Sequence, residues 1–241
     1  MYDIHCHIFP AVDDGSGSFN DSVEMARLAC LSGVKAVIAT PHCNIPGVFE
    51  NYWNESFDDT LKKLNETLVS LEIPLTVFKG QEVFSYGDIV SKLKAGNLIT
   101  LNGSKYVLIE FDFDTAEKSA LDTVEQIKAE GYVPVVAHPE RYGFVFENPM
   151  SILKIRSSGG LIQLNSGSIK GSFGPDPQKL AAAILKSGAA DFIASDAHSQ
   201  YSRTPDIRDA HEIVCSAFSY DYAKLLFETN PLRIINDEEI R

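Results

Sequence analysis

The sequence predicts an α/β fold, a closed or nearly closed barrel of seven βα units, on three observations. Short runs rich in β-branched residues alternate with longer segments whose apolar residues recur every three or four positions. Seven such units follow one another without a Ser/Gly-rich linker or an internal repeat. The length, 241 residues, is one at which α/β barrels form a single unit. We therefore expect residues 1–241 to form one domain, with a doubly wound open sheet as the alternative.

The predicted strands are almost continuously apolar, which is typical of parallel strands covered by helices. They span residues 2–6, 35–40, 75–80, 106–109, 133–137, 160–164 and 192–194. Amphipathic spacing and stop signals such as Gly33, Gly131 and Gly188 predict the helices between them. These helices span residues 21–32, 57–71, 121–127, 148–157, 179–186 and 207–217, followed by a helical tail over 221–241 that is interrupted at Pro231.

The net charge of −12 argues against nucleic acid as a partner, because an acidic surface repels phosphate backbones. A small phosphorylated group is still compatible, since bound cations can reverse the local sign of a site. No apolar run approaches the ~20 residues that span a bilayer, and no signal peptide is apparent. The four cysteines form no CxxC pair, so we expect a reduced, cytoplasmic setting. No Cys precedes an Arg by six positions, which excludes the Cys-nucleophile phosphatase loop.

Side chains of the metal-ligand type stand where each predicted strand ends. They are His5-Cys6-His7, Pro41-His42, Gln81-Glu82, Glu110, His138, Asn165 and Ser195-Asp196-Ala197-His198. The carboxyl ends of barrel strands converge on one rim, so we expect these side chains to meet. Residues two apart in a strand face the same way, which lets His5 and His7 bind one ion. Asp13 and Asp14 lie in the loop after the first strand, which can bring a carboxylate back over the site.

Singly, each of these residues has an ordinary structural interpretation, such as Asp196 as a helix cap and Asn165 as a turn residue. His211 lies inside a helical pattern and is interpreted as a surface or packing histidine. Together they are more specific, because five of the six histidines fall at predicted strand ends. Mixed imidazole and carboxylate ligands favour Mn, Fe or Zn over Ca or Mg. We expect Cys6 and Cys43 to be structural.

These residues resemble the polymerase and histidinol phosphatase (PHP) superfamily, whose signatures are HxH, a middle His, a further His and a terminal DxH. Within it, the chain resembles the bacterial manganese-dependent protein-tyrosine phosphatases of capsule and exopolysaccharide operons. The matching stretches are DIHCHIFPAVDDG (3–15), ATPH (39–42), GQE (80–82), YVLIEF (106–111), VVAHPERY (135–142), QLNSGSIKGSFG (163–174) and ASDAHS (194–199). They span nearly the whole chain. Cys43 departs from the pattern, where the family often has a second His.

The resemblance implies a distorted, PHP-type (β/α)7 barrel, similar to a TIM barrel, with three divalent metal ions. The expected ions are Mn²⁺, with Fe or Zn as alternatives. The implied ligands are His5, His7, Asp14, His42, Glu82, Glu110, His138, Asp196 and His198. Arg141 and Arg203 would contact phosphate, and Asp14 or a metal-bound water could assist the leaving group. Attack on phosphorus would come from a metal-activated hydroxide.

The expected substrate, again through the resemblance, is the Tyr-rich tail of a capsule-assembly tyrosine kinase. Phe49, Tyr52 and Trp53 could line an entrance for an aromatic side chain or pack at the base of the next helix. A small-molecule phosphatase such as histidinol phosphatase is the enzymatic alternative, and a metal-stabilised binding module is the non-enzymatic one. Glu110 argues against an amidohydrolase with a lysine-derived bridging ligand. A homo-oligomer remains open, and no membrane insertion is expected.

Overall fold

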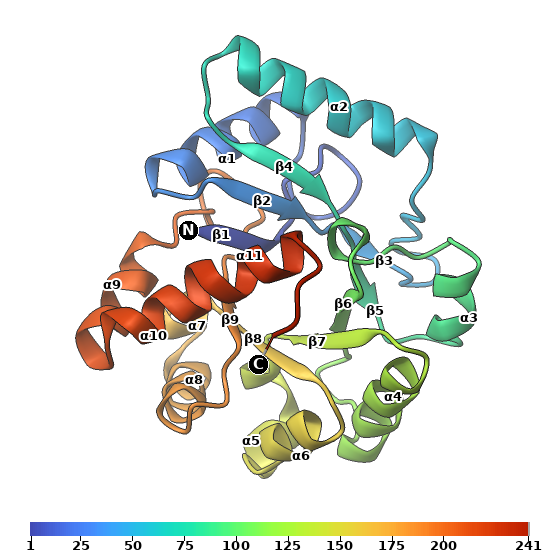
Figure 1. Cartoon of the computed structure of the whole chain (residues 1–241), viewed down its shortest axis with the longest axis vertical. Coiled ribbons are helices and arrows are strands. Elements are labelled where there is room, and N and C mark those ends of the chain that lie inside the picture. Colours follow the sequence, from blue (N-terminus) through green and yellow to red (C-terminus); the bar gives the residue numbers. More distant parts are fainter. Residues whose placement is uncertain (241) are drawn as a thin grey trace.

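A computed structural model describes residues 1–240 and has the predicted alternation of strands and helices (Figure 1). Every strand pairing is parallel. One sheet has the order β1 (Tyr2–Cys6), β2 (Ala36–Ala39) and β4 (Thr76–Lys79). The other has the order β3 (His42–Cys43), β5 (Glu82–Phe84), β6 (Tyr106–Glu110), β7 (Val133–Ala137), β8 (Leu161–Asn165) and β9 (Phe192–Ala194). The α/β class with parallel strands is therefore confirmed.

Of the closed or nearly closed barrel that was expected, a closed sheet is not found within residues 1–240, because backbone pairing divides the strands into these two sheets. The second and third predicted strands each stop early and resume as a short strand, β3 after Pro41 and β5 after Gly80 and Gln81. Proline has no N–H for the ladder. A Cβ at Gly80 would lie 2.7 Å from Cγ2 of Ile38, so a larger residue there would force the neighbouring side chain to shift.

The remaining gap lies between β1 and β9, whose ends approach without forming a ladder. A single bridge pairs Cys6 with Ala197. Two backbone hydrogen bonds, each 2.8 Å long, run from the His7 N–H to the Ala197 carbonyl and from the Asp196 N–H to the His5 carbonyl. The first and last strands are thus held together at their carboxyl ends, where the predicted ligands lie.

Helices cover the outside of the strands (Figure 1). Those predicted are α1 (Phe19–Leu31), α2 (Glu55–Ser70), α4 (Glu117–Ala129), α6 (Ser151–Ser157), α8 (Pro175–Lys186) and α9 (Arg208–Ala217). Three short helices were not predicted: α3 (Ile89–Lys94), α5 (Gly143–Glu147) and α7 (Ser166–Lys170). No helix in residues 1–240 has both the length and the apolar character needed to cross a bilayer.

The C-terminal tail is helical, as predicted, and consists of α10 (Tyr220–Lys224), a π-helical turn η3 (Leu225–Thr229) and α11 (Asn230–Ile235). Pro231 does not interrupt it, because proline is tolerated in the first turn of α11, where its missing N–H costs little. Arg241, the last residue of the predicted tail, lies outside the described residues. Helix α11 crosses in front of the strands in Figure 1 and contacts β1.

Two apolar clusters stabilise the fold. The larger fills the space between the strands and the outer helices. The smaller, which we call the inner cluster, lies among the strands and includes a side chain of α11. Its buried members are Ile4, Ile38, Leu101, Tyr106, Leu108, Val135, Ala137, Phe192, Ala194 and Ile234.

In some strands, the face that contributes side chains to the inner cluster carries apolar residues first and a carboxylate at its end. In β6, Tyr106 and Leu108 belong to the cluster, and Glu110 follows two positions later. In β9, Phe192 and Ala194 belong to it, and Asp196 follows. The same face of each strand therefore changes from apolar to ligand-forming toward its carboxyl end.

Candidate metal centre

All nine residues implied as ligands lie together at the carboxyl ends of the strands. Three groups each offer ligand atoms within 4.8 Å of one another. The groups are His7, Asp14, His42 and His198; His5, His7 and Asp196; and His42, Glu82 and Glu110. The ninth residue, His138, joins through Nε2, which lies 3.1 Å from Oε1 of Glu82 and 3.5 Å from Oε1 of Glu110. Side chains from residue 5 to residue 198 thus share one centre.

Glu82 lies in the middle of this centre and is fully buried. Its oxygens lie 3.2 Å from Nε2 of His5, 3.2 Å from Nε2 of His7 and 3.0 Å from Nδ1 of His42. Burial works against its ionised form, but the surrounding imidazoles lower the pKa of Glu82 well below its usual value. Conversely, although burial disfavours the charged imidazole, Glu110 and Glu82 raise the pKa of His138 to about 10. The cluster is thus an acidic pocket that favours positive charge.

The ligand atoms are arranged to bind divalent cations and not to satisfy one another by hydrogen bonds. Four buried atoms of the cluster have no hydrogen-bond partner within residues 1–240: Nδ1 of His42, Oε2 of Glu82, Nδ1 of His138 and Nε2 of His198. His42 Nδ1 and Glu82 Oε2 are close but lack hydrogen-bond alignment. The Nε2 atoms of His5 and His7 face each other at 3.3 Å. Buried polar atoms left in this way are costly unless a cation is shared, and imidazole with carboxylate suits Mn, Fe or Zn.

Two further residues orient the first two histidines. The Nδ1 of His5 lies 2.9 Å from Oε1 of Gln163, and the Nδ1 of His7 lies 2.7 Å from Oδ2 of Asp13. An oxygen at this nitrogen favours the tautomer with Nδ1–H, which leaves the Nε2 lone pair directed into the cluster. The loop of Asp13 and Asp14 was expected to bring a carboxylate over the site, and Asp13 lies there as the partner of His7. Gln163 was not predicted as a site residue.

Asn165 is part of the centre, so its interpretation as a turn residue was wrong. Its Nδ2 donates to Oδ2 of Asp196 at 2.6 Å, and its Oδ1 accepts from Nε2 of Gln163 at 2.9 Å. Both amides are fully buried in β8. The signal was present in the sequence, because Gln163 and Asn165 are polar residues two positions apart, on one face of an otherwise apolar strand.

Arg141 and Arg203 stand at the mouth of the centre and both approach Asp196. Nη2 of Arg203 lies 2.7 Å from Oδ2 of Asp196, and Nη1 of Arg141 lies 3.7 Å from the same atom. The Arg141 guanidinium lies between two aromatic rings, 4.8 Å from the centroid of Phe113 and 4.7 Å from that of Phe173. Sequence reasoning did not identify these two phenylalanines, because they lie in different loops.

Phe49, Tyr52 and Trp53 were expected either to line an entrance or to pack at the base of the next helix, and the structure places them differently from one another. Phe49 stacks on His42, with ring centroids 5.7 Å apart and planes 10° apart, and so lies at the centre. Trp53 packs edge-on against Phe9 and Phe57 at the start of α2, the structural alternative. Tyr52 donates its hydroxyl to Oδ1 of Asn44.

Cys6, Cys43 and His211, which were interpreted as structural, occupy structural positions. Cys6 and Cys43 are fully buried in the larger apolar cluster. His211, in α9, packs edge-on against Phe227 of η3. Neither cysteine lies among the candidate ligand groups.

The backbone is strained around the centre. Three of its residues adopt left-handed conformations, His138 with φ 34°, Asp196 with φ 50° and Arg203 with φ 47°. Such conformations cost about 1–3 kcal/mol each in residues other than glycine and concentrate at functional sites. Because these residues depart from extended backbone geometry, the two-residue periodicity of a strand does not predict where their side chains point.

Known proteins resemble this chain over its full length. A family model for capsular polysaccharide synthesis, CpsB/CapC, matches residues 1–236. The tyrosine-protein phosphatase YwqE of Bacillus subtilis is 37% identical over 241 residues, covering 100% of this chain and 94% of YwqE. The tyrosine-protein phosphatase CpsB of Streptococcus pneumoniae is 31% identical over 245 residues, covering 100% of both.

A solved structure agrees closely with this fold. It comes from work on YwqE and CpsB, described as unique metal-dependent tyrosine phosphatases, and superposes with a TM-score of 0.94 at 36% identity. The match covers 100% of this chain and 96% of the solved one. By sequence and by fold, the chain belongs to the CpsB/CapC family of capsular polysaccharide synthesis proteins.

Proposed function

We propose that this chain is a metal-dependent protein-tyrosine phosphatase, a hydrolase of phosphoric monoesters. The observation that carries the proposal is one mouth where nine imidazole and carboxylate side chains meet two arginines. The names of its relatives, tyrosine-protein phosphatases in a capsule-synthesis family, support the same activity. We also infer that residues 1–241 act as one catalytic domain.

Three divalent ions, with Mn²⁺ as the expected metal, would be held by the nine residues of the centre. The three groups of converging ligand atoms support this number. Such ions, when bound, lower the pKa of water toward ~7 and neutralise phosphoryl charge. Asp14, Glu82, Glu110 and Asp196 contribute four negative charges against six from the ions, so the loaded centre is net positive in an acidic chain.

The protein's own groups bind and orient the ester. Arg141 and Arg203 stand side by side at Asp196, and a planar guanidinium can donate two N–H groups to one phosphoryl group. Gln163 and Asp13 hold His5 and His7 in place before substrate arrives. Phe49, stacked on His42, offers an aromatic surface at the mouth for a phenyl ester. A phenolate, with a pKa of ~10, is a good leaving group and reduces the need for a strong acid.

The physiological substrate that we propose is the phosphorylated Tyr-rich tail of a capsule-assembly tyrosine kinase. The capsule-synthesis family supports it. We place this encounter in the cytoplasm, a setting that suits a chain with four free thiols.

A single set of assays tests the function. Purified protein is analysed for metal and assayed with a phosphotyrosyl peptide and with histidinol phosphate, each with added Mn²⁺ and with chelator. We expect Mn²⁺-dependent hydrolysis of the peptide, abolished by chelator. His138→Ala should lose activity, whereas His211→Ala, at a histidine outside the centre, is the matched control. Preferential hydrolysis of histidinol phosphate, or full activity in His138→Ala, would contradict the proposal.

A further inference from the structure

A second hollow adjoins the candidate metal centre. It has a volume of about 230 Å³ and lies between α7, the loop after it and the segment that carries Arg203. Lys170, Phe173, Tyr201, Ser202, Arg203 and Thr204 are among the residues that line it. We call it the Lys170 pocket.

The Lys170 pocket differs in charge from the rest of the molecule. The chain has a net charge of −12, yet the residues that line this hollow include two cationic side chains, Lys170 and Arg203, and no carboxylate. The Nζ of Lys170 donates to the backbone carbonyl of Asp206 at 3.3 Å, which uses one of its three N–H groups. Hydroxyls of Ser202 and Thr204 stand among the lining residues. Cations combined with hydroxyl donors are the typical surroundings of a bound anion.

The pocket shares two residues with the candidate metal centre and its surroundings. Arg203 is shared, because its Nη2 holds Asp196 of the metal centre while the residue also lines the pocket. Phe173 is shared as well, since its ring lies 4.7 Å from the Arg141 guanidinium and 5.8 Å from that of Arg203. Tyr201 is 84% exposed, so the pocket opens to solvent and to an incoming chain. Because Arg203 belongs to both, residues next to a phosphotyrosine bound at the centre would lie near this hollow.

We propose that the Lys170 pocket is a substrate subsite that binds an anionic side chain near the phosphotyrosine in the substrate sequence. The ligand chemistry is a carboxylate or a second phosphate. This inference rests on the proposed phosphatase function and extends it from the phosphate to the sequence around it. It gives the enzyme a reason to prefer a tail with clustered tyrosines or acidic neighbours over an isolated phosphotyrosine.

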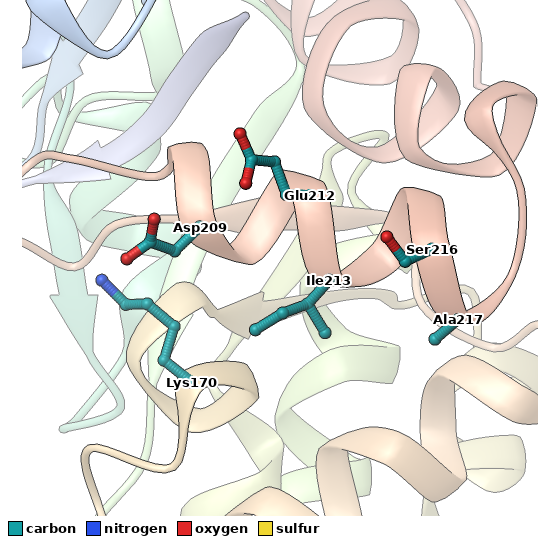
Figure 2. Close-up of a pocket in the computed structure, with 6 residues that line it drawn as sticks. All are labelled: Lys170, Asp209, Glu212, Ile213, Ser216 and Ala217. Carbon is teal, nitrogen blue, oxygen red and sulfur yellow. The ribbon is translucent and has the colours of Figure 1, made fainter.

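Lys170 also borders a larger and more open hollow of about 750 Å³ on its other side, next to α9. Figure 2 shows the ammonium end of Lys170 directed toward Asp209, with Glu212 farther along the same helix. Asp209 therefore competes with an incoming anion for Lys170. Removing the charge of Asp209 should therefore strengthen anion binding in the Lys170 pocket, whereas removing Lys170 should weaken it.

The test compares three peptides that differ beside one phosphotyrosine: neutral neighbours, glutamate neighbours and a second phosphotyrosine. For each, kcat/KM is measured with the Mn²⁺-loaded enzyme, and Kd is measured separately with the metal-free protein. We expect the anionic peptides to exceed the neutral one about three- to tenfold, mostly in KM, as for a partly exposed charged contact. The glutamate and phosphate peptides distinguish the two sources of negative charge.

Lys170→Ala should bring this ratio close to one, and Asp209→Asn should increase it. Lys179→Ala, at an exposed lysine of α8 whose partner is Asp176, is the matched control and should keep the wild-type ratio. Equal values for neutral and anionic peptides in the wild type, or an unchanged ratio in Lys170→Ala, would overturn the subsite. If no peptide is hydrolysed, the phosphatase function fails, and the Kd ratios still decide whether the pocket selects anions.

Discussion

The two ends of the strand interior are built from the same faces of the same strands but from opposite kinds of residue. At the amino end, Tyr106 and Phe192 pack in the inner cluster under Ile234 of α11. At the carboxyl end, Glu110 and Asp196 hold histidines. The first end gains free energy by burying apolar area. The second end buries carboxylates and imidazoles that need a cation to satisfy them.

This difference teaches that stability and chemistry are separated along each strand, as is usual in α/β barrels. At the amino end, a change of side-chain volume should lower the free energy of unfolding but leave activity intact. At the carboxyl end, a change of a ligand side chain should abolish activity but leave the fold intact. The following variants test that separation, beginning with the largest expected effect.

Glu82→Gln tests the carboxyl end at its centre. The change keeps the shape but removes a charge that contacts His5, His7 and His42. We expect turnover to fall at least about 10³-fold, more than the ~10–100-fold typical of residues behind the ligands. Metal content should fall as well, while the metal-free protein keeps its fold. Metal analysis, circular dichroism and steady-state kinetics check this, and unchanged metal content would refute the assignment.

Ile234→Ala tests the amino end. Ile234 is fully buried on α11, and truncating such a side chain typically costs about 2–5 kcal/mol of unfolding free energy. Ile234→Val should cost only about 0.5–1.5 kcal/mol. Denaturant titration measures both. The folded fraction should keep its kcat and metal content, and a large loss of kcat in Ile234→Val would show that the two ends are coupled.

Gln163→Leu tests a residue of β8 that lies between the two ends. The change removes the oxygen at Nδ1 of His5 and the donor to Asn165. We expect metal affinity to fall about 10–100-fold, the typical effect of losing a partner that orients a ligand. Excess Mn²⁺ should restore much of the activity. Metal titration of kcat measures this, and an unchanged half-saturating concentration would count against the orienting role.

Phe113→Leu tests the support of Arg141 and should have the smallest effect. The change keeps an apolar side chain but removes the ring whose centroid lies 4.8 Å from the guanidinium. A partly exposed cation–π contact is worth about 0.5–1 kcal/mol, so KM should rise about two- to fivefold with little change in kcat. Phe146→Leu, at another exposed phenylalanine, is the control. Equal KM values in the two variants would exclude a positioning role.

Local pattern predicted much of this fold and site. The strands that begin at Tyr2, Val133 and Phe192 have the predicted bounds, because a buried apolar run is a local property. The implied ligands come together because strand ends mark a common rim. The nine residues could therefore be assembled before any coordinates, with the resemblance supplying Asp14.

Other features depend on partners distant in the chain. The lack of room for a side chain at Gly80 depends on Ile38 in a neighbouring strand, which no local pattern reports. Gln163 acquires its role only because His5 lies opposite it, 158 positions away. The left-handed backbone of His138 and Asp196 has no signature in residue type alone. Phe113 and Phe173 enclose Arg141 from loops that are separate in sequence.

The bond from the Asp196 N–H to the His5 carbonyl has a consequence for how the enzyme is made. The first strand leaves the ribosome early, but its partner at this seam is translated some 190 residues later. A nascent chain therefore carries His5 and His7 without the carboxylate and imidazole that complete their group. The group of His42, Glu82 and Glu110 can assemble earlier, but the groups that need Asp196 or His198 are complete only after the end of the last strand has been translated.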